Sequence, residues 1–228
     1  MNSTHLRKFK ELHRGEAERN QAVKNMKTRR DVFSIIERSN DIVKDCSAIL
    51  DWGGMHGENR RRIVSQPDKS WLKLAKQAKI GNLNRFELYS EFSDLQARDK
   101  LKGMGPAYFT KLIYFLMPDD PHNPRGYIMD QWVGCAVNIL NDSDVVLMDS
   151  SYTKKWSKAR KIKPDSNYQV TNVNTVENYK SFCRQIEILA EEISVKPDFA
   201  ECLLMSKGGT KPLEWRAYVK ANRRPCYE

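Results

Sequence analysis

The stretch Leu101-Lys102-Gly103-Met104-Gly105-Pro106-Ala107 decides the fold of this 228-residue chain. Two glycines one residue apart allow a tight turn, because glycine adopts positive φ without steric cost. Proline directly after the second glycine suits the first position of a helix. The apolar run PAYFTKLIYFLM (106–117) continues as a core helix, and the preceding segment 93–102 is expected to form a second helix that starts at Ser93. The stretch therefore predicts a helical hairpin over residues 93–117.

The turn of this hairpin has the composition of an anion site. The backbone amides at the start of a helix have no partner within the helix, and they carry a partial positive charge. Glycines let a phosphate approach these amides closely. We therefore expect Lys102, Gly103, Gly105 and Ala107 to bind a phosphate. A tight helical hairpin without any ligand is the alternative interpretation.

A single aspartate follows the hairpin in a position suited to chemistry. The turn-rich loop PDDPHNPRG (118–126) leads into GYIMDQWV (126–133), where Asp130 opens a helix over 130–140. A carboxylate at a helix N-terminus is stabilised in its ionised form. An ionised carboxylate stabilises positive charge that develops close to it during a reaction. The alternative role of Asp130 is that of an ordinary helix N-cap.

The hairpin with Asp130 placed 27 residues after Gly103 resembles the helix-hairpin-helix DNA glycosylase superfamily. The segments WGGM (52–55), VENY (176–179) and ECLL (201–204) are similar to its bacterial 8-oxoguanine-glycosylase-like branch, over residues 31–206. The resemblance implies a mainly α, all-helical fold with a cleft between two lobes. It also implies a DNA glycosylase that flips out a modified base and hydrolyses its N-glycosidic bond, with Asp130 as the catalytic carboxylate.

One position departs from the family pattern. Bifunctional members of the branch carry a nucleophilic lysine just after the hairpin glycines, where this chain has Ala107. Alanine forms no Schiff base. Lys111, one helical turn further on the same face, and Lys102, just before the glycines, are the candidate substitutes. A structural or phosphate-facing role is the alternative for each. We therefore expect a monofunctional enzyme that uses water. The departure leaves two substrate classes open, an oxidised purine or a hypermodified phage base such as glucosylated hydroxymethylcytosine, removed in anti-phage defence.

Further residues are expected to contact DNA. Trp52, Tyr127 and Trp132 lie near the motif elements, and they either stack on the flipped base or pack in the core. Asn82 or Asn84 is a candidate for filling the gap that the flipped base leaves in the duplex. The run SYTKKWSKARKIK (151–163) has six basic residues and no acidic one, and its candidate DNA contacts are Lys154, Lys155, Lys158 and Arg160. A solvated loop is the alternative interpretation of this run.

The composition points to an intracellular nucleic-acid partner. The formal net charge of +10 attracts polyanions, and double-stranded DNA is the expected partner of what we predict to be a monomer. The five cysteines are scattered without C-x-x-C spacing, so we expect no metal and no cofactor. No apolar stretch has the length of a membrane span, and the polar start is no secretory signal, which predicts a cytoplasmic, nucleoid-associated protein.

The sequence divides into a basic N-terminal segment over 1–30 and a glycosylase domain over 31–228, and it predicts a short strand at Asp144–Met148.

Two other functions remain open. A non-catalytic helix-hairpin-helix protein also binds DNA backbone, but it has no need of a carboxylate beside the phosphate site. An RNA-binding or structural helical protein has only the charge in its favour.

Overall fold

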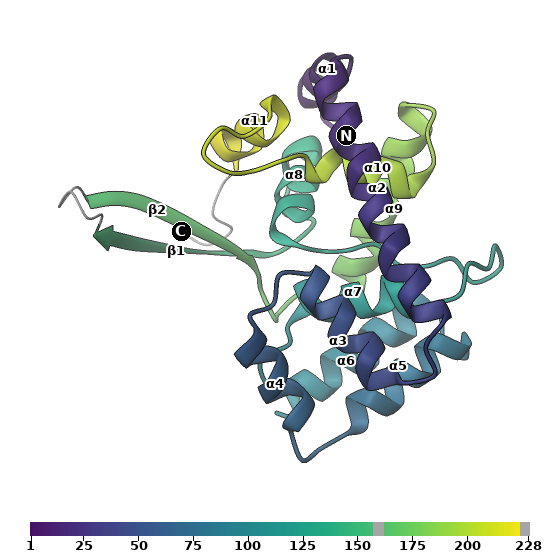
Figure 1. Ribbon diagram of the computed structural model, residues 1–228. Coiled ribbons are helices and arrows are strands. Elements are labelled where there is room, and N and C mark those ends of the chain that lie inside the picture. The colour runs from purple at the N-terminus through teal and green to yellow at the C-terminus, as the bar shows by residue number, and fades with distance from the viewer. Residues whose placement is uncertain (157–161, 224–228) are drawn as a thin grey trace.

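A computed structural model describes the backbone of residues 1–156 and 162–223, and the side chains of 1–149 and 168–223. This part of the chain contains eleven helices and one two-stranded sheet, which confirms the expected mainly α fold (Figure 1). The helices pack in two groups. We call them the α3–α7 lobe and the α8–α11 lobe, and the second also includes α1 and most of α2.

The α3–α7 lobe is formed by consecutive helices that pack on one another. Side-chain caps fix several of its helix starts. Asn84, for example, accepts hydrogen bonds from two backbone amides of α6 in a capping box with Glu87. The lobe consists of α3 (Ile42–Trp52), α4 (Gly57–Ser65), α5 (Ser70–Ile80), α6 (Arg85–Ala97) and α7 (Pro106–Leu116).

The α8–α11 lobe joins the two ends of the chain. Its central helix α10 packs on α2, α8 and α9, while α1 and α11 pack together beside α8. Phe9 and Trp215 of this lobe are fully buried, as is Trp71 in the α3–α7 lobe. The lobe consists of α1 (Ser3–Leu12), α2 (Glu16–Glu37), α8 (Gln131–Asn141), α9 (Val176–Glu192), α10 (Pro197–Met205) and α11 (Glu214–Asn222).

A β-hairpin projects from the helical body (Figure 1). Strand β1 (Met148–Trp156) pairs antiparallel with β2 (Ile162–Val170), from Met148 opposite Val170 to Trp156 opposite Ile162. The short strand expected at Asp144–Met148 instead begins at Met148 and is paired with a second strand. The paired residues are mostly polar, so the sequence has little apolar alternation to mark them as strands.

Two expected boundaries also differ in the structure. Helix α2 runs without a break through residue 30 to Glu37, so the boundary at residue 30 falls inside a helix that buries Ala22 and Arg29. The first helix of the hairpin begins at Arg85 and passes through Ser93, which is therefore no helix start. The Asn84 capping box fixes the start of α6, and no helix-breaking residue separates Asn84 from Ser93.

Candidate active site

A cavity of about 610 Å³ lies where the two lobes and the β-hairpin meet. It brings together six of the residues expected to act in the site, namely Gly103, Gly105, Ala107, Lys111, Asp130 and Trp132. Helix α7 of one lobe and the start of α8 of the other supply most of them. The expected cleft between two lobes is therefore present, and the β-hairpin forms its third wall.

The hairpin turn has the backbone geometry that its glycines predict. Gly103 has a φ of 80°, in the left-handed region that favours glycine. Gly105 approaches the side chain of Asn172 so closely that a Cβ atom would lie 2.6 Å from its Oδ1. Lys102 is exposed beside the turn, and its carbonyl accepts a hydrogen bond from Gln66. The turn is thus held in place while Lys102 and Gly103 are exposed to solvent.

Asp130 is the N-cap of α8. Its Oδ1 accepts hydrogen bonds from the amides of Trp132 and Val133, at 2.8 and 3.0 Å. The side chain is half-buried and borders the cavity. The N-cap interpretation of Asp130 is therefore confirmed, and its catalytic role stays a prediction for a carboxylate that lines the cavity.

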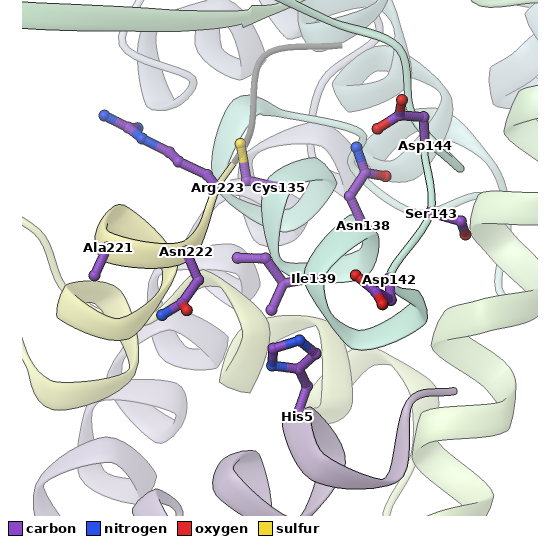
Figure 2. A pocket seen from close by; sticks show the side chains of 10 residues that line it. All are labelled: His5, Cys135, Asn138, Ile139, Asp142, Ser143, Asp144, Ala221, Asn222 and Arg223. Carbon is purple, nitrogen blue, oxygen red and sulfur yellow. The ribbon is translucent and has the colours of Figure 1, made fainter.

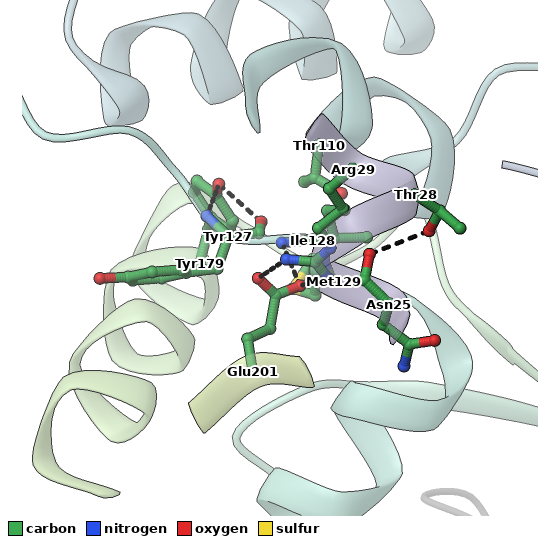
Figure 3. Close-up of polar contacts among 9 residues, drawn as sticks. All are labelled: Asn25, Thr28, Arg29, Thr110, Tyr127, Ile128, Met129, Tyr179 and Glu201. Carbon is green, nitrogen blue, oxygen red and sulfur yellow. Dashed lines mark hydrogen bonds and ion pairs between the residues drawn. The ribbon is translucent and has the colours of Figure 1, made fainter. Parts of the chain in front are cut away.

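The backbone that leads to Asp130 is fixed by three buried side chains from three helices (Figure 3). The Tyr179 hydroxyl accepts a hydrogen bond from the Tyr127 amide and donates one to the Tyr127 carbonyl. Glu201 accepts from the Ile128 amide at 3.1 Å. Thr110 Oγ1 accepts from the Met129 amide at 3.1 Å. Each of the three residues before Asp130 thus has its own side-chain anchor.

Glu201 is itself held by Arg29 in a fully buried ion pair. Both guanidinium Nη atoms contact the two carboxylate oxygens, at 3.0 and 3.2 Å. Burial raises the pKa of Glu201, an effect that the charge of Arg29 opposes. The Arg29 guanidinium also lies 4.7 Å from the centre of the Tyr114 ring. Helix α2 is thereby connected to the segment that carries Asp130.

Lys111 enters the cavity from α7 as a buried ammonium. Its Nζ donates to the carbonyl of Ala107, and among the described residues it forms no ion pair. Burial lowers the pKa of Lys111, although attraction to Asp130 and Glu201 opposes the shift. Gly53 makes room for the lysine stem, since a Cβ there would lie 2.7 Å from Lys111 Cδ. Gly53, the first glycine of the WGGM segment, therefore leaves the space in which the Lys111 side chain packs.

The three aromatic candidates have different positions. Trp132 lines the cavity, as expected for a residue that stacks on a base. Tyr127 is buried, its ring faces Arg85 and its hydroxyl is directed at Glu187, so it is absent from the cavity lining. Trp52 packs on Phe115 at 4.9 Å between ring centres and is likewise no lining residue. Tyr127 and Trp52 thus pack against other side chains outside the cavity lining, and stacking of these two residues on a base stays a prediction.

The structure does not bring Asn82 or Asn84 to the cavity. Their turn packs beyond the C-terminal end of α7, where Asn123 contacts the carbonyls of Gly81 and Leu83. The cavity lies at the opposite, N-terminal end of α7. Asn84 instead caps α6. These asparagines have the local pattern of a turn, and that pattern carries no information about distance from the site.

Several cavity residues were missed because they lie in the β-hairpin and the turn after it. They include a second carboxylate, and they are Asp149, Tyr168, Gln169, Val170, Thr171 and Asn172. Of the expected basic contacts, Lys154 and Lys155 lie on β1, while their side chains and all of Lys158 and Arg160 lie outside the described residues. The other missed residues are Tyr108 and Gln131, each next to a motif residue, and Gly53 of the WGGM segment.

A second cavity of about 420 Å³ lies between α1, α8 and α11, and it contains none of the hairpin residues (Figure 2).

Among the described residues, no cluster of three or more His, Cys, Asp or Glu side chains is arranged to hold a metal ion. No helix in the described ranges is long and apolar enough to cross a membrane.

Comparison with known proteins gives one family. Residues 3–205 match the family described as "Putative 8-oxoguanine DNA glycosylase OGG-like protein". No curated protein and no solved structure matches the chain. The matched range includes the hairpin turn, Lys111 and Asp130, and it extends across both lobes. The chain therefore belongs to this OGG-like protein family.

Proposed function

We propose that this protein removes a modified base from double-stranded DNA and leaves an abasic site. The observation that carries the proposal is the cavity in which the hairpin glycines of one lobe meet Asp130 of the other. The hairpin amides bind a phosphate of the target strand, and the flipped nucleotide then enters the cavity. Asp130 stabilises the positive charge that develops on the sugar and orients the attacking water.

The size of the cavity supports a bulky substrate base. Its volume of about 610 Å³ falls within the range of roughly 300–1,000 Å³ that accommodates drug-sized ligands. A bare nucleobase is smaller than such a ligand, so there is space for a substituent such as a hexose. We therefore propose glucosylated hydroxymethylcytosine of phage DNA as the first substrate to test, with 8-oxoguanine as the second. Removal of the phage base would make the protein part of anti-phage defence.

We propose water as the nucleophile, because Ala107 occupies the position of the family lysine. One observation favours a second reaction, in which the Lys111 amine attacks the sugar C1′ and displaces the base. Lys111 lines the cavity, and its lowered pKa makes the neutral, nucleophilic amine more accessible. Displacement gives an aminal at C1′, and when the amine loses a proton and the C1′–O4′ bond breaks, a Schiff base forms. Borohydride reduces this Schiff base to a stable protein–DNA adduct, whereas hydrolysis by water gives no adduct.

The experiment measures base release and abasic sites on two duplexes, one with glucosylated hydroxymethylcytosine and one with 8-oxoguanine. The proposal expects abasic sites on at least one of them, without strand cleavage and without a borohydride adduct. A borohydride adduct that disappears in Lys111→Met would identify Lys111, instead of water, as the nucleophile. Tight, salt-dependent binding without base release from either duplex would favour a non-catalytic DNA-binding protein.

A further inference from the structure

Helix α11 lies beyond the family-matched residues 3–205, yet it packs on α8, the helix that Asp130 caps. Trp215 anchors this helix. Its ring is fully buried, its Nε1 donates to the carbonyl of Leu204 at 3.1 Å, and its backbone amide donates to Glu18 at 2.9 Å. Arg216, the next residue, is therefore held in a defined position relative to α8.

The Arg216 guanidinium covers the ring of Trp132. Its Cζ lies 3.6 Å from the ring centre. Nε donates to the carbonyl of Met205 at 3.0 Å, and Nη2 donates to the carbonyl of Ser206 at 3.0 Å. Arg216 is only 6% exposed. A planar cation is thus clamped between two carbonyls and one aromatic face of the cavity wall.

Other cations of the same region surround the aromatic wall. The Arg223 guanidinium lies 4.0 Å from the Tyr168 ring centre, and Lys220 Nζ lies 5.9 Å from that of Trp132. Both rings line the cavity. Burial lowers the pKa of Arg216 to about 10, a shift that Asp130 and Glu18 oppose. Arg216 is therefore still cationic at neutral pH, and the stack on Trp132 is maintained.

We propose that Arg216 is a positioning residue for base recognition, which holds Trp132 at the cavity wall so that the indole stacks on the flipped base. This inference rests on the proposed function. It assigns a role in that function to a helix outside the family-matched range. Lysine is no substitute at this position, because its ammonium lacks the planar fork that stacks on an indole while it binds two carbonyls.

The test compares Arg216→Lys with Arg184→Lys, a control at an exposed arginine of α9. Single-turnover excision is measured on the glucosylated hydroxymethylcytosine and 8-oxoguanine duplexes. Affinity is measured on a duplex with a tetrahydrofuran abasic analogue, which has no base to stack. Since base–aromatic stacking is worth on the order of a tenfold effect, Arg216→Lys should slow excision about tenfold. Its affinity for the abasic duplex should stay within about twofold of the wild type, because the phosphate contacts are unchanged.

Two results would overturn the inference. One is an unchanged excision rate in Arg216→Lys, and the other is an equal loss of excision and abasic-duplex affinity, which indicates a general DNA contact. If Arg216→Lys fails to fold, Trp132→Ala must reproduce the base-dependent loss, and equal losses there also overturn it. A wild-type protein that excises neither base overturns the proposed function itself, and the inference with it.

Discussion

Arg29 and Lys111 are both buried cations, and their surroundings differ. Arg29 forms a bidentate ion pair with Glu201, which fixes the Ile128 amide in turn. Lys111 faces the cavity, and within the described part of the chain it has no ion-pair partner. A neutralised buried cation contributes to structure, whereas a buried cation without a partner costs free energy. The Arg29–Glu201 pair therefore supports the backbone before Asp130, whereas Lys111 belongs to the cavity wall.

The largest effect on stability is expected at Arg29. Arg29→Met leaves the buried Glu201 carboxylate without a counter-charge, which should lower the free energy of unfolding by about 3–5 kcal/mol. Urea unfolding of Arg29→Met and of Arg30→Met, a change at the exposed neighbour, measures the difference. Equal midpoints for the two variants would refute a structural role of the ion pair.

A smaller effect is expected at Thr110, which lies beside Lys111 on α7 and anchors the Met129 amide. Thr110→Val preserves the shape of the side chain but leaves this buried amide without a partner. The variant should lose about 1–3 kcal/mol of stability. Excision should slow about tenfold, because Asp130 loses part of its support. The exposed Thr210→Val is the control, and a Thr110→Val enzyme of normal rate would show that the anchor does not position Asp130.

The smallest effect, with the opposite sign, is expected at Lys111. Lys111→Met removes a buried cation that has no ion-pair partner among the described residues, and it should raise the free energy of unfolding by about 1 kcal/mol at neutral pH. Exposed Lys76→Met is the control and should stay near the wild type. A destabilised Lys111→Met would mean that the ammonium is well compensated, and the contrast with Arg29 would be lost.

The same variant has a defined pH dependence. The folded-state pKa of Lys111 lies below its usual value of 10.5, so between these two pKa values the unfolded chain binds more protons than the folded one. The stability of the wild type therefore rises with pH in this window relative to Lys111→Met. Unfolding curves over the alkaline range should show the gap between the two proteins narrowing. A constant gap would contradict a lowered pKa.

The sequence predicted the parts of the site that are local in the chain. Gly103 and Pro106 mark the turn and the start of α7, and Asp130 marks the start of α8, because glycine, proline and capping preferences act over a few residues. The pairing of Arg29 with Glu201 spans 172 positions and leaves no local pattern. The stack of Arg216 on Trp132 is equally non-local. The polar β-hairpin was missed for a different reason, since its strands have little hydrophobic alternation.

In the proposed reaction the charge of Asp130 drives base removal, and Asp130→Asn removes this charge. Asparagine still accepts the hydrogen bonds that cap α8, so the change removes the charge and preserves the cap. Excision by Asp130→Asn should fall on the order of a hundredfold to a thousandfold. DNA affinity and melting temperature should match those of Asp94→Asn, a control at an exposed residue. Full excision by Asp130→Asn would contradict the account.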